Sequence, residues 1–289
     1  MLTASLGNGI FTQHSSTIIT YGETHMDWRK FTLVLGISTL FSASTPVVSV
    51  SAPCKSFGCN TSPSGQLYHQ AKSITVKVLS TDFLGSGILL EKRGSNYRVL
   101  TNAHVLQAGD RPYRIQTPDG TIYTANLPKK LNFGNNDLAL LQFHSKTKIY
   151  AVASIGASPV VGDEVFAGGF PATEESSQAK GFTLTTGKIL LVLPKPLEGG
   201  YQLGYTNNLE KGMSGGPLLN RHGEVVGVNG MHAYPLWDAP SVFQDGSKTD
   251  EELHKMIIRL SWAVSMEKIL HLTQKSTKTP HFSVLNKAD

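Results

Sequence analysis

Cysteine is nearly absent from this sequence, which contains only Cys54 and Cys59 among 289 residues. A zinc site would need two more thiolate or imidazole ligands at regular spacing, and no CxxC or HExxH motif offers them. In an oxidising compartment the two thiols can close one short loop, so Cys54 and Cys59 are a candidate disulfide. A chain of this length buries a core that needs no further support. We therefore expect a fold with no metal and no cofactor.

A run of basic residues is also absent, although the formal net charge is +5. The lysines and arginines are scattered, and removal of residues 1–52 leaves the charge at +5, because two basic and two acidic residues are lost together. A surface that binds nucleic acid gathers its basic residues on one face. We therefore expect an ordinary basic surface and no nucleic-acid partner.

One long uncharged stretch lies near the N-terminus. Arg29 and Lys30 precede an apolar run from Phe31 to Ala43, and small residues continue to Ala52. This is the layout of a secretory signal peptide. The second half of the stretch is rich in Ser, Thr and Pro and would insert poorly into a bilayer. The pattern predicts an exported protein, periplasmic or secreted, with no stable membrane insertion after the leader is cleaved.

The basic residues of the leader stand far from Met1. Because a leader normally begins close to its basic residues, we expect translation to start at Met26. Residues 53–68 are rich in Ser, Pro and Gly and suggest a linker that holds the candidate disulfide loop. The predicted organisation is an upstream extension and signal peptide over 1–52, a linker over 53–68, one folded domain over 69–275 with an internal boundary near 150–162, and a tail over 276–289.

Short β-type runs fill the chain after this linker. Turn residues separate them at intervals of roughly eight to twelve residues, the spacing of a barrel or sandwich. The predicted strands lie within 73–80, 85–92, 97–102, 113–120, 121–128, 137–143, 163–171, 181–194, 201–207 and 217–230. Near the end, residues 265–274 change to helical spacing, with Ser265 as a candidate N-cap. No internal sequence repeat is present, but the similar strand counts of the two halves suggest two like barrels.

Residues 212–216, GMSGG, fit two incompatible motifs. As G-x-S-x-G they form the nucleophile elbow of an α/β-hydrolase, and as GxSGGP they resemble the active-serine segment of trypsin-like proteases. The elbow requires a helix directly after the serine, in a chain where strands alternate with helices. Here Gly-Gly-Pro follows Ser214, which opposes a helix, and strands follow strands. The context therefore favours the protease motif.

Two upstream residues complete a constellation with Ser214. His104 in TNAHVLQ and Asp137 in NNDLALLQF each have an ordinary structural interpretation when taken alone, the aspartate as a turn residue. Together the order His104, Asp137, Ser214 is that of chymotrypsin. A hydrolase would need an acid and a histidine after residue 214, such as Asp250 with His271. The order of the three residues also favours the protease.

Several segments together resemble bacterial trypsin-like serine proteases of the chymotrypsin fold. The resemblance covers roughly residues 70–270 and rests on GSGILL, TNAHVL, DLALL, GMSGGPLLN and GEVVGVNG. It implies an all-β fold of two packed six-stranded antiparallel barrels with a short C-terminal helix. His104 and Asp137 would lie on the first barrel and Ser214 on the second, with the active site between them. The chain ends soon after residue 274, so we expect no PDZ module, and a monomer.

The chemistry explains why these residue types are needed. A serine hydroxyl is a weak nucleophile, so His104 would take its proton during attack and return it to the leaving amine. Asp137 would hold the imidazole in the tautomer whose other nitrogen faces Ser214. The backbone N–H groups of Gly212 and Ser214 would form the oxyanion hole, and glycine at 212 permits the backbone geometry this needs.

The segment around the serine also departs from digestive relatives. Met213 stands where those enzymes carry the aspartate that pairs with a newly cut N-terminus, so activation by that ion pair is not expected. Asn208, six residues before the serine, gives no charge for a basic substrate side chain. Asn229 stands where glutamate-cleaving relatives often have histidine. We predict Asn208, Asn229 and Gly230 as substrate-binding residues for a small or uncharged side chain, with Gly230 through His232 pairing with the substrate backbone.

The sequence therefore predicts an exported serine endopeptidase that acts on polypeptides through an acyl-enzyme. Two alternatives remain open. One is a catalytically inactive homologue that binds peptides, and the other is an α/β-hydrolase esterase that uses Ser214.

Overall fold

The computed structural model describes residues 63–128, 133–173, 178–234 and 241–270, all within one compact unit. The predicted leader, the candidate disulfide between Cys54 and Cys59, and the tail lie outside the described residues. Among the described helices none is long and apolar enough to cross a membrane.

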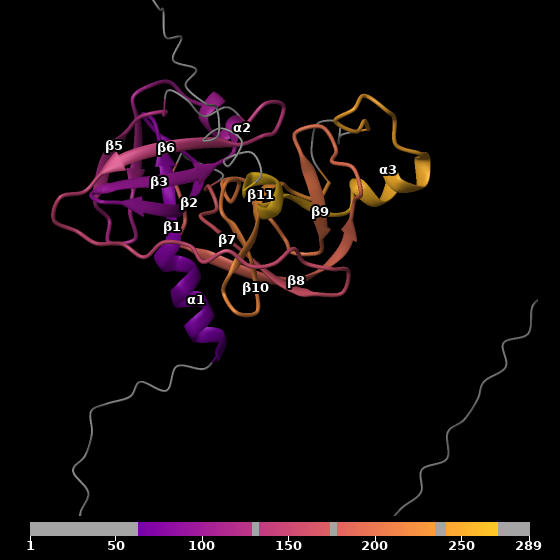
Figure 1. The fold of residues 1–289 in the computed structure, drawn as a ribbon, viewed down its shortest axis with the longest axis horizontal. Helices are drawn as coiled ribbons and strands as arrows, with labels where there is room; N and C mark the ends of the chain where they lie inside the picture. Colours follow the sequence, from indigo (N-terminus) through magenta and orange to yellow (C-terminus); the bar gives the residue numbers. More distant parts are fainter. Residues whose placement is uncertain (1–62, 129–132, 174–177, 235–240, 271–289) are drawn as a thin grey trace, which may run out of the picture. The chain divides into compact units, whose positions relative to one another are not determined.

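The first half of the described chain forms a six-stranded antiparallel sheet in the order β5-β4-β1-β2-β3-β6 (Figure 1). Its strands are β1 Thr75–Leu79, β2 Phe83–Arg93, β3 Asn96–Thr101, β4 Tyr113–Gln116, β5 Ile122–Ala125 and β6 Ala139–His144. Side chains alternate between faces along a strand, and in β1 the β-branched Val76 and Val78 are buried on one face. Reciprocal backbone hydrogen bonds of 2.9 and 2.8 Å between Asn126 and Gln142 join the β5 and β6 edges. The first sheet is therefore nearly a barrel.

The second half closes completely into a barrel in the order β10-β11-β12-β9-β8-β7. Its strands are β7 Glu164–Gly169, β8 Thr183–Val192, β9 Tyr201–Tyr205, β10 Pro217–Asn220, β11 Val225–Met231 and β12 Ser261–Ser265. Pairing of β10 with β7 completes the ring. The predicted all-β fold of two six-stranded antiparallel sheets is confirmed. The same architecture excludes the α/β-hydrolase alternative, because strand β10, not a helix, follows the Ser214 turn.

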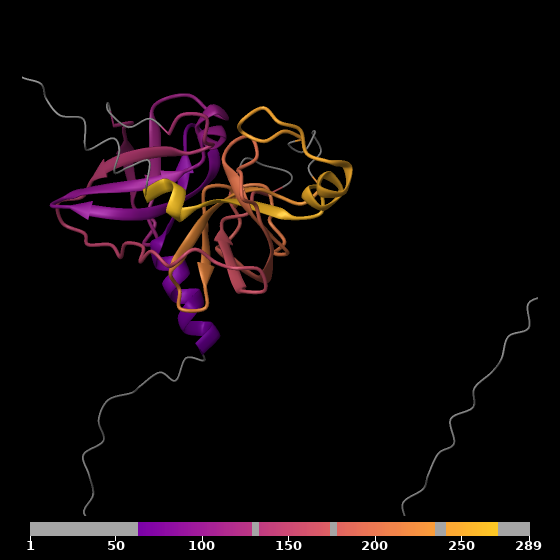
Figure 2. The same cartoon turned by 45° about the vertical axis from the view of Figure 1, so that its right-hand side comes forward.

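Three apolar clusters hold the two sheets. One lies inside the first sheet, one inside the closed barrel, and the largest contains residues of both sheets. The shared cluster includes Ile88 and Leu100 of the first sheet, Val264 of the second, and Met266 and Ile269 of the helical residues 266–270 that follow β12. Figure 2 shows this short yellow helix against the ribbons of the first sheet. The predicted C-terminal helix is thus present, although Ser265 ends β12.

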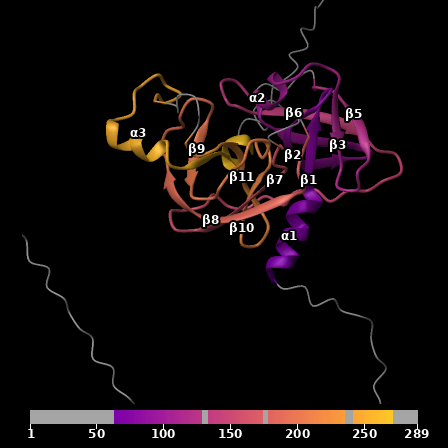
Figure 3. The same cartoon turned by 180° about the vertical axis from the view of Figure 1, so that it is seen from behind.

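Helix α1, Pro63–Ile74, corrects the sequence expectation of a linker to residue 68 and a strand from residue 73. Proline suits the first turn of a helix, since its missing N–H has no intrahelical partner there. Leu67, Ala71 and Ile74 recur at helical spacing and are buried on one face. Figures 1 and 3 both show α1 beneath the sheets, beside β1. Composition indicated a loop here, but tertiary burial of this apolar face decides for a helix.

Two more helices lie in connections. Helix α2, Ala103–Gln107, follows β3, and helix α3, Glu251–Ile257, precedes β12. The Asp250 side chain caps α3 by accepting a hydrogen bond from the Leu253 N–H at 2.7 Å. Helix α3 is absent from the elements predicted above, where Asp250 is named only as the acid that a hydrolase would need.

Candidate active site

His104 lies on the first turn of α2, three residues after Thr101, where β3 ends. Asn102 connects β3 to this helix in an extended conformation, and its side chain does not cap the helix. Its Nδ2 instead donates to the Asp137 carbonyl at 2.8 Å. The polar side chain of Asn102 therefore ties the segment that carries His104 to the segment that carries Asp137.

Asp137 stands just before β6 and meets His104 through both carboxylate oxygens. Oδ1 accepts from the His104 backbone N–H at 2.9 Å, and Oδ2 lies 2.6 Å from His104 Nδ1. The carboxylate side chain is 14% exposed and the imidazole 44% exposed. The structure thus brings together the first two residues of the predicted triad, with the imidazole open to solvent.

The charge of Asp137 fixes the orientation of the imidazole proton. Burial raises the pKa of Asp137, but hydrogen bonds from His104, the charge interaction with His104 and a hydrogen bond from Tyr201 together lower it below its usual value. The carboxyl group is therefore ionised at neutral pH and can only accept hydrogen bonds. Nδ1 of His104 must carry the proton that lies between them, which leaves Nε2 of the neutral ring as an acceptor.

Ser214 lies in a tight turn between β9 and β10 of the closed barrel. Gly212 and Gly215 on either side have φ of +94° and +84°, where only glycine is unstrained. The Ser214 carbonyl accepts from the Ser86 backbone N–H of β2 at 2.9 Å. A side chain at Gly215 would also overlap the Ser86 carbonyl. The glycines of GMSGG therefore serve both the turn and its close approach to the first sheet.

The Ser214 hydroxyl donates to the Gly230 carbonyl at 3.1 Å. Among the hydrogen bonds of the described residues, none joins this hydroxyl to His104. In unliganded active sites the distance between the serine and the histidine often shortens only when substrate binds. The serine turn nevertheless approaches α2, since a Cβ at Gly85 would lie 2.9 Å from Val105 Cγ2 and 3.2 Å from the Ser214 carbonyl oxygen. Rotation about the Ser214 Cα–Cβ bond is the movement that redirects the hydroxyl.

The backbone N–H groups of Gly212 and Ser214 donate to no other residue that the structure describes. Buried N–H groups are rarely left without a partner, so this pair is suited to an external oxyanion. Ser86 orients the turn by donating from Oγ to the Gly212 carbonyl at 2.8 Å and accepting from the Phe170 N–H at 2.9 Å. The sequence pattern gives Ser86 no visible role, because its partners lie 84 and 126 residues away.

The predicted substrate-binding role of Asn229 is wrong. Its side chain is fully buried, its Oδ1 accepts from Tyr205 Oη at 2.8 Å, and its Nδ2 donates to the Gly168 and Pro217 carbonyls at 3.1 and 3.0 Å. Side chains alternate along a strand, and position 229 of β11 faces the barrel interior. Asn229 therefore joins strands and has no hydrogen-bonding group left for a substrate.

The other two predicted substrate-binding residues are Asn208 and Gly230. Asn208 is exposed, in the connection between β9 and the serine turn, and Gly230 meets Ser214 through its carbonyl. Met213 is fully buried in the apolar cluster of the closed barrel, and its Sδ accepts from the Glu210 N–H at 3.4 Å. The position that carries an aspartate in digestive relatives thus packs as part of a core.

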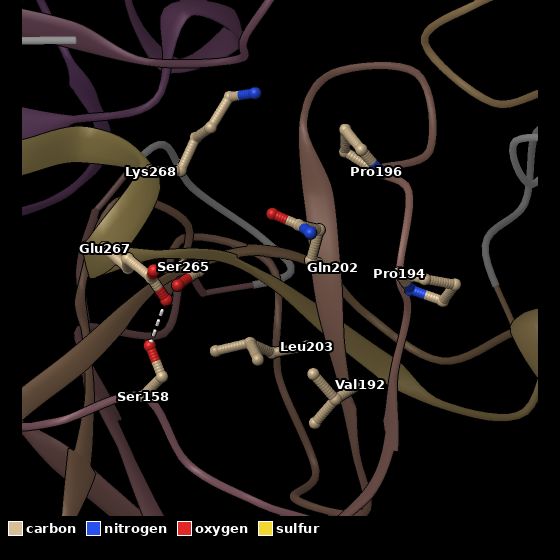
Figure 4. A pocket seen from close by; sticks show the side chains of 9 residues that line it. All are labelled: Ser158, Val192, Pro194, Pro196, Gln202, Leu203, Ser265, Glu267 and Lys268. Carbon is tan, nitrogen blue, oxygen red and sulfur yellow. Dashed lines mark hydrogen bonds between the residues drawn. The ribbon is translucent and has the colours of Figure 1, made fainter. Parts of the chain in front are cut away.

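Cavities near and away from this site differ in their chemistry. One of about 550 Å³ borders Asp137 and is lined by residues of α2, by residues 134–137 and by the loop at 242–246. Another, of about 280 Å³, lies on the closed barrel, where Ser158 Oγ donates to Glu267 at 2.6 Å (Figure 4). The second holds no histidine beside its serine.

In the described parts of the chain, no group of three or more His, Cys, Asp or Glu side chains is arranged to bind a metal.

Two packed six-stranded antiparallel sheets, with a histidine–aspartate pair on one and a serine in a glycine turn on the other, define the trypsin-like serine peptidases. The family model described as "Trypsin-like peptidase domain" matches residues 85–228, so the chain carries such a domain. The match contains His104, Asp137 and Ser214.

Similar proteins agree with this class. The chain is 31% identical over 152 residues to "Serine protease Do-like HtrA" of Bacillus subtilis, covering 51% of this chain and 33% of the relative. It is 33% identical over 147 residues to "Periplasmic pH-dependent serine endoprotease DegQ" of Escherichia coli, covering 50% of this chain and 30% of the relative. The matched region thus spans about a third of the length of these relatives.

A solved structure shows the same fold. The serine endoprotease from Yersinia pestis superimposes with a TM-score of 0.52 at 22% identity, covering 76% of this chain and 68% of that chain. At this identity the likeness concerns the fold alone.

Proposed function

We propose that this chain is a serine endopeptidase that cleaves polypeptides through His104, Asp137 and Ser214. The observation that carries the proposal is the pairing of an ionised Asp137 with His104 Nδ1 at 2.6 Å. Ser214 lies in a neighbouring glycine turn, where the N–H groups of Gly212 and Ser214 donate to no residue that the structure describes. Peptide substrates follow from the class of the family model that matches residues 85–228.

The reaction begins when the Ser214 hydroxyl rotates from the Gly230 carbonyl toward His104. Nε2 of His104 takes the hydroxyl proton as Oγ attacks the scissile carbonyl carbon, and Asp137 stabilises the imidazolium that forms. His104 then donates this proton to the leaving amine, which leaves an acyl-enzyme on Ser214 Oγ. A water molecule, deprotonated by the same nitrogen, attacks the ester carbonyl, and His104 returns that proton to Ser214 Oγ as the bond to the acyl group breaks and the second product leaves.

The developing negative charge on the substrate oxygen is stabilised by the Gly212 and Ser214 N–H groups. Since both belong to a turn fixed by Ser86, these donors need no rearrangement when charge develops. The carbonyl of Gly230 and the backbone up to His232 accept the substrate as an added strand on β11. Asn208, which is exposed, is the remaining candidate for contact with the substrate side chain.

We further propose that the protein is exported. The support is the layout of residues 29–52 as a signal peptide, together with the word "periplasmic" in the name of the DegQ relative. Because Met213 packs in an apolar core and bears no charge, the enzyme becomes competent on folding, with no ion pair to a new N-terminus.

A phosphonate that reacts with activated serines tests this function directly. We expect covalent labelling between pH 6 and 9 that is lost in Ser214→Ala and retained in Ser95→Ala, a matched change in the turn between β2 and β3. Mass spectrometry of the labelled peptide locates the adduct. Absence of labelling across this range would favour the inactive peptide-binding homologue, to which the bond from Ser214 Oγ to Gly230 lends some support.

A further inference from the structure

Asp137 receives a hydrogen bond from the closed barrel as well as from His104. The hydroxyl of Tyr201, the first residue of β9, donates to Asp137 Oδ2. Tyr201 is 7% exposed and belongs to the cluster shared by the two sheets. The proposed acid of the first sheet is therefore held by a side chain of the second.

The backbone before Tyr201 is shaped for this contact. Gly199 and Gly200 have φ of +79° and +87°, and the Gly199 carbonyl accepts from the Asp137 N–H at 2.7 Å. A side chain at Gly200 would overlap the Asn136 side chain. Two consecutive glycines thus let the start of β9 lie directly against the segment that carries Asp137.

Gly230 leaves the space that the phenol occupies. A Cβ added at Gly230 would lie 2.6 Å from Tyr201 Oη and would overlap its ring. The Gly230 carbonyl is also the acceptor of the Ser214 hydroxyl. The Tyr201 phenol therefore lies between the Gly230 backbone, which contacts Ser214, and the Asp137 carboxylate, which contacts His104.

We propose that Tyr201 is a positioning residue, which fixes the Asp137 carboxylate against His104, and that Gly230 is required to admit its phenol. The inference rests on the proposed function, since it concerns the same site. Oδ1 of Asp137 is held by the His104 N–H, and Oδ2 receives both the His104 ring and the phenol. With donors on both oxygens the carboxylate cannot turn away from Nδ1.

The surroundings of the phenol keep it a donor. Burial raises the pKa of Tyr201 well above its usual value, and the charge of Asp137 raises it further. The hydroxyl therefore keeps its proton at neutral pH. His104 on α2 and Tyr201 on β9 are the titratable side chains that contact Asp137, with Tyr205 farther along β9. In the described ranges no Lys or Arg pairs with Asp137. The phenol and the imidazole therefore share one carboxylate without a competing cation.

The test is Tyr201→Phe, which removes the hydroxyl and keeps the ring. We expect kcat to fall about tenfold with little change in KM, because the donor acts on the base and not on the substrate. The negative charge of Asp137, no longer shared with the phenol, would stabilise protonated His104 more strongly. The acid limb of the pH profile of kcat/KM should therefore move to higher pH by a few tenths of a unit.

The matched control is Tyr205→Phe, the same change on the same strand. Tyr205 is also buried and donates to Asn229, which contacts no proposed catalytic group. We expect Tyr205→Phe to lower the urea midpoint of unfolding while the acid limb stays in place. An acid limb that is unmoved, or moves to lower pH, in Tyr201→Phe would overturn the proposal.

Two further measurements keep the test decisive. If Tyr201→Phe does not fold, Gly230→Ala displaces the phenol by placing a methyl group beside Oη, and the same upward shift is expected. In a Ser214→Ala background, the downfield proton resonance of His104 Nδ1–H should shift on Tyr201→Phe, and an unchanged resonance counts against the proposal. This signal needs no turnover, so the role of Tyr201 and the function of Ser214 are tested separately. The resonance can stay unchanged while Ser214 is labelled, or it can shift while Ser214 is not labelled.

Discussion

The two sheets hold their shares of the candidate site in different ways. On the first, His104 and Asp137 have ordinary backbone conformations and are fixed by hydrogen bonds between side chains and backbone. On the second, Ser214 is fixed by the backbone itself, through positive φ at Gly212 and Gly215. The proposed base and acid are thus held by polar groups of neighbouring residues, whereas the turn that carries the proposed nucleophile takes its shape from two glycines.

The comparison also reveals a reciprocal arrangement. Ser86 of β2 holds the serine turn of the closed barrel, and Tyr201 of β9 holds Asp137 beside the first sheet. Each half of the site is therefore oriented by a side chain from the other sheet. The geometry of the site therefore depends on correct packing of the two sheets. Variants of residues on either sheet can test this dependence.

Removal of one reacting group from each sheet should have the largest effect. We expect His104→Ala and Ser214→Ala each to lower kcat by about a millionfold, and the double variant to be no worse than either single variant. The physical reason is that base and nucleophile act in one step, so loss of either leaves only binding and the oxyanion donors. Single-turnover hydrolysis of a fluorogenic peptide measures this. Additive losses in the double variant would show that the two sheets act independently.

Gly212→Ala is expected to lower kcat by about a hundredfold or more. An added Cβ would lie 2.7 Å from the Phe170 carbonyl oxygen and 2.8 Å from the Ala172 nitrogen, on a backbone with φ of +94°. The turn must shift, and with it the N–H that would meet the substrate oxygen. Gly94→Ala is the control, because it has a positive φ of +60° but nothing within 4 Å of its added Cβ. Equal losses of activity in the two variants would contradict an oxyanion role for Gly212.

Ser86→Ala should affect stability and activity together. The Gly212 carbonyl and the Phe170 N–H would lose their partners in a buried site, at a cost of about 1–3 kcal/mol in the free energy of unfolding. We expect kcat to fall about tenfold as the serine turn loosens. Urea unfolding and peptide hydrolysis measure the two effects. Ser95→Ala, a change of a half-buried serine in the turn between β2 and β3, should change neither. If Ser86→Ala were as stable and as active as the parent chain, the reciprocal arrangement would be contradicted.

The general fold and the three residues of the proposed triad could be predicted from the sequence, but the side chains that position these three residues could not. The resemblance that implied two six-stranded barrels rests on short segments such as TNAHVL and GMSGGPLLN, each of which is recognisable from adjacent residues alone. Ser86 and Tyr201 could not be found, since their partners lie 126 and 64 residues away and a lone serine or tyrosine in a strand has no distinctive pattern.

Asn229 shows the opposite error. The resemblance to proteases suggested that Asn229 lies on a strand that lines the substrate pocket. The face of the strand on which its side chain lies depends on strand register. Register is set by pairing of β11 with β10 and β12, and this turns Asn229 into the barrel. Helix α1 was missed for a related reason, since its apolar face gains its stability from contacts with distant strands.

The smallest effect we predict lies away from the site, in the turn between β4 and β5 of the first sheet. Burial alone would raise the pKa of Asp119, but hydrogen bonds from Lys148, Thr117 and Thr121 outweigh it and lower that pKa. A carboxyl whose pKa is lower in the folded state stabilises the fold above its unfolded pKa of about 3.9, and this contribution is lost as the pH falls through the folded pKa. Because the side chain is 36% exposed, solvent screening should limit the contribution to less than about 1 kcal/mol.

Asp119→Asn should therefore be slightly less stable than the parent chain at pH 7, and the difference should shrink by pH 3, as urea unfolding at both values would reveal. Activity at pH 7 should be unchanged, because neither sheet's share of the site contacts this turn. The same substitution at Asp137 removes an acceptor of His104 and should abolish nearly all activity while the fold persists. If Asp119→Asn instead reduced kcat appreciably, the first sheet would transmit strain from its far edge to His104. The positioning of the base would then depend on the whole sheet and not on the local hydrogen bonds around Asp137.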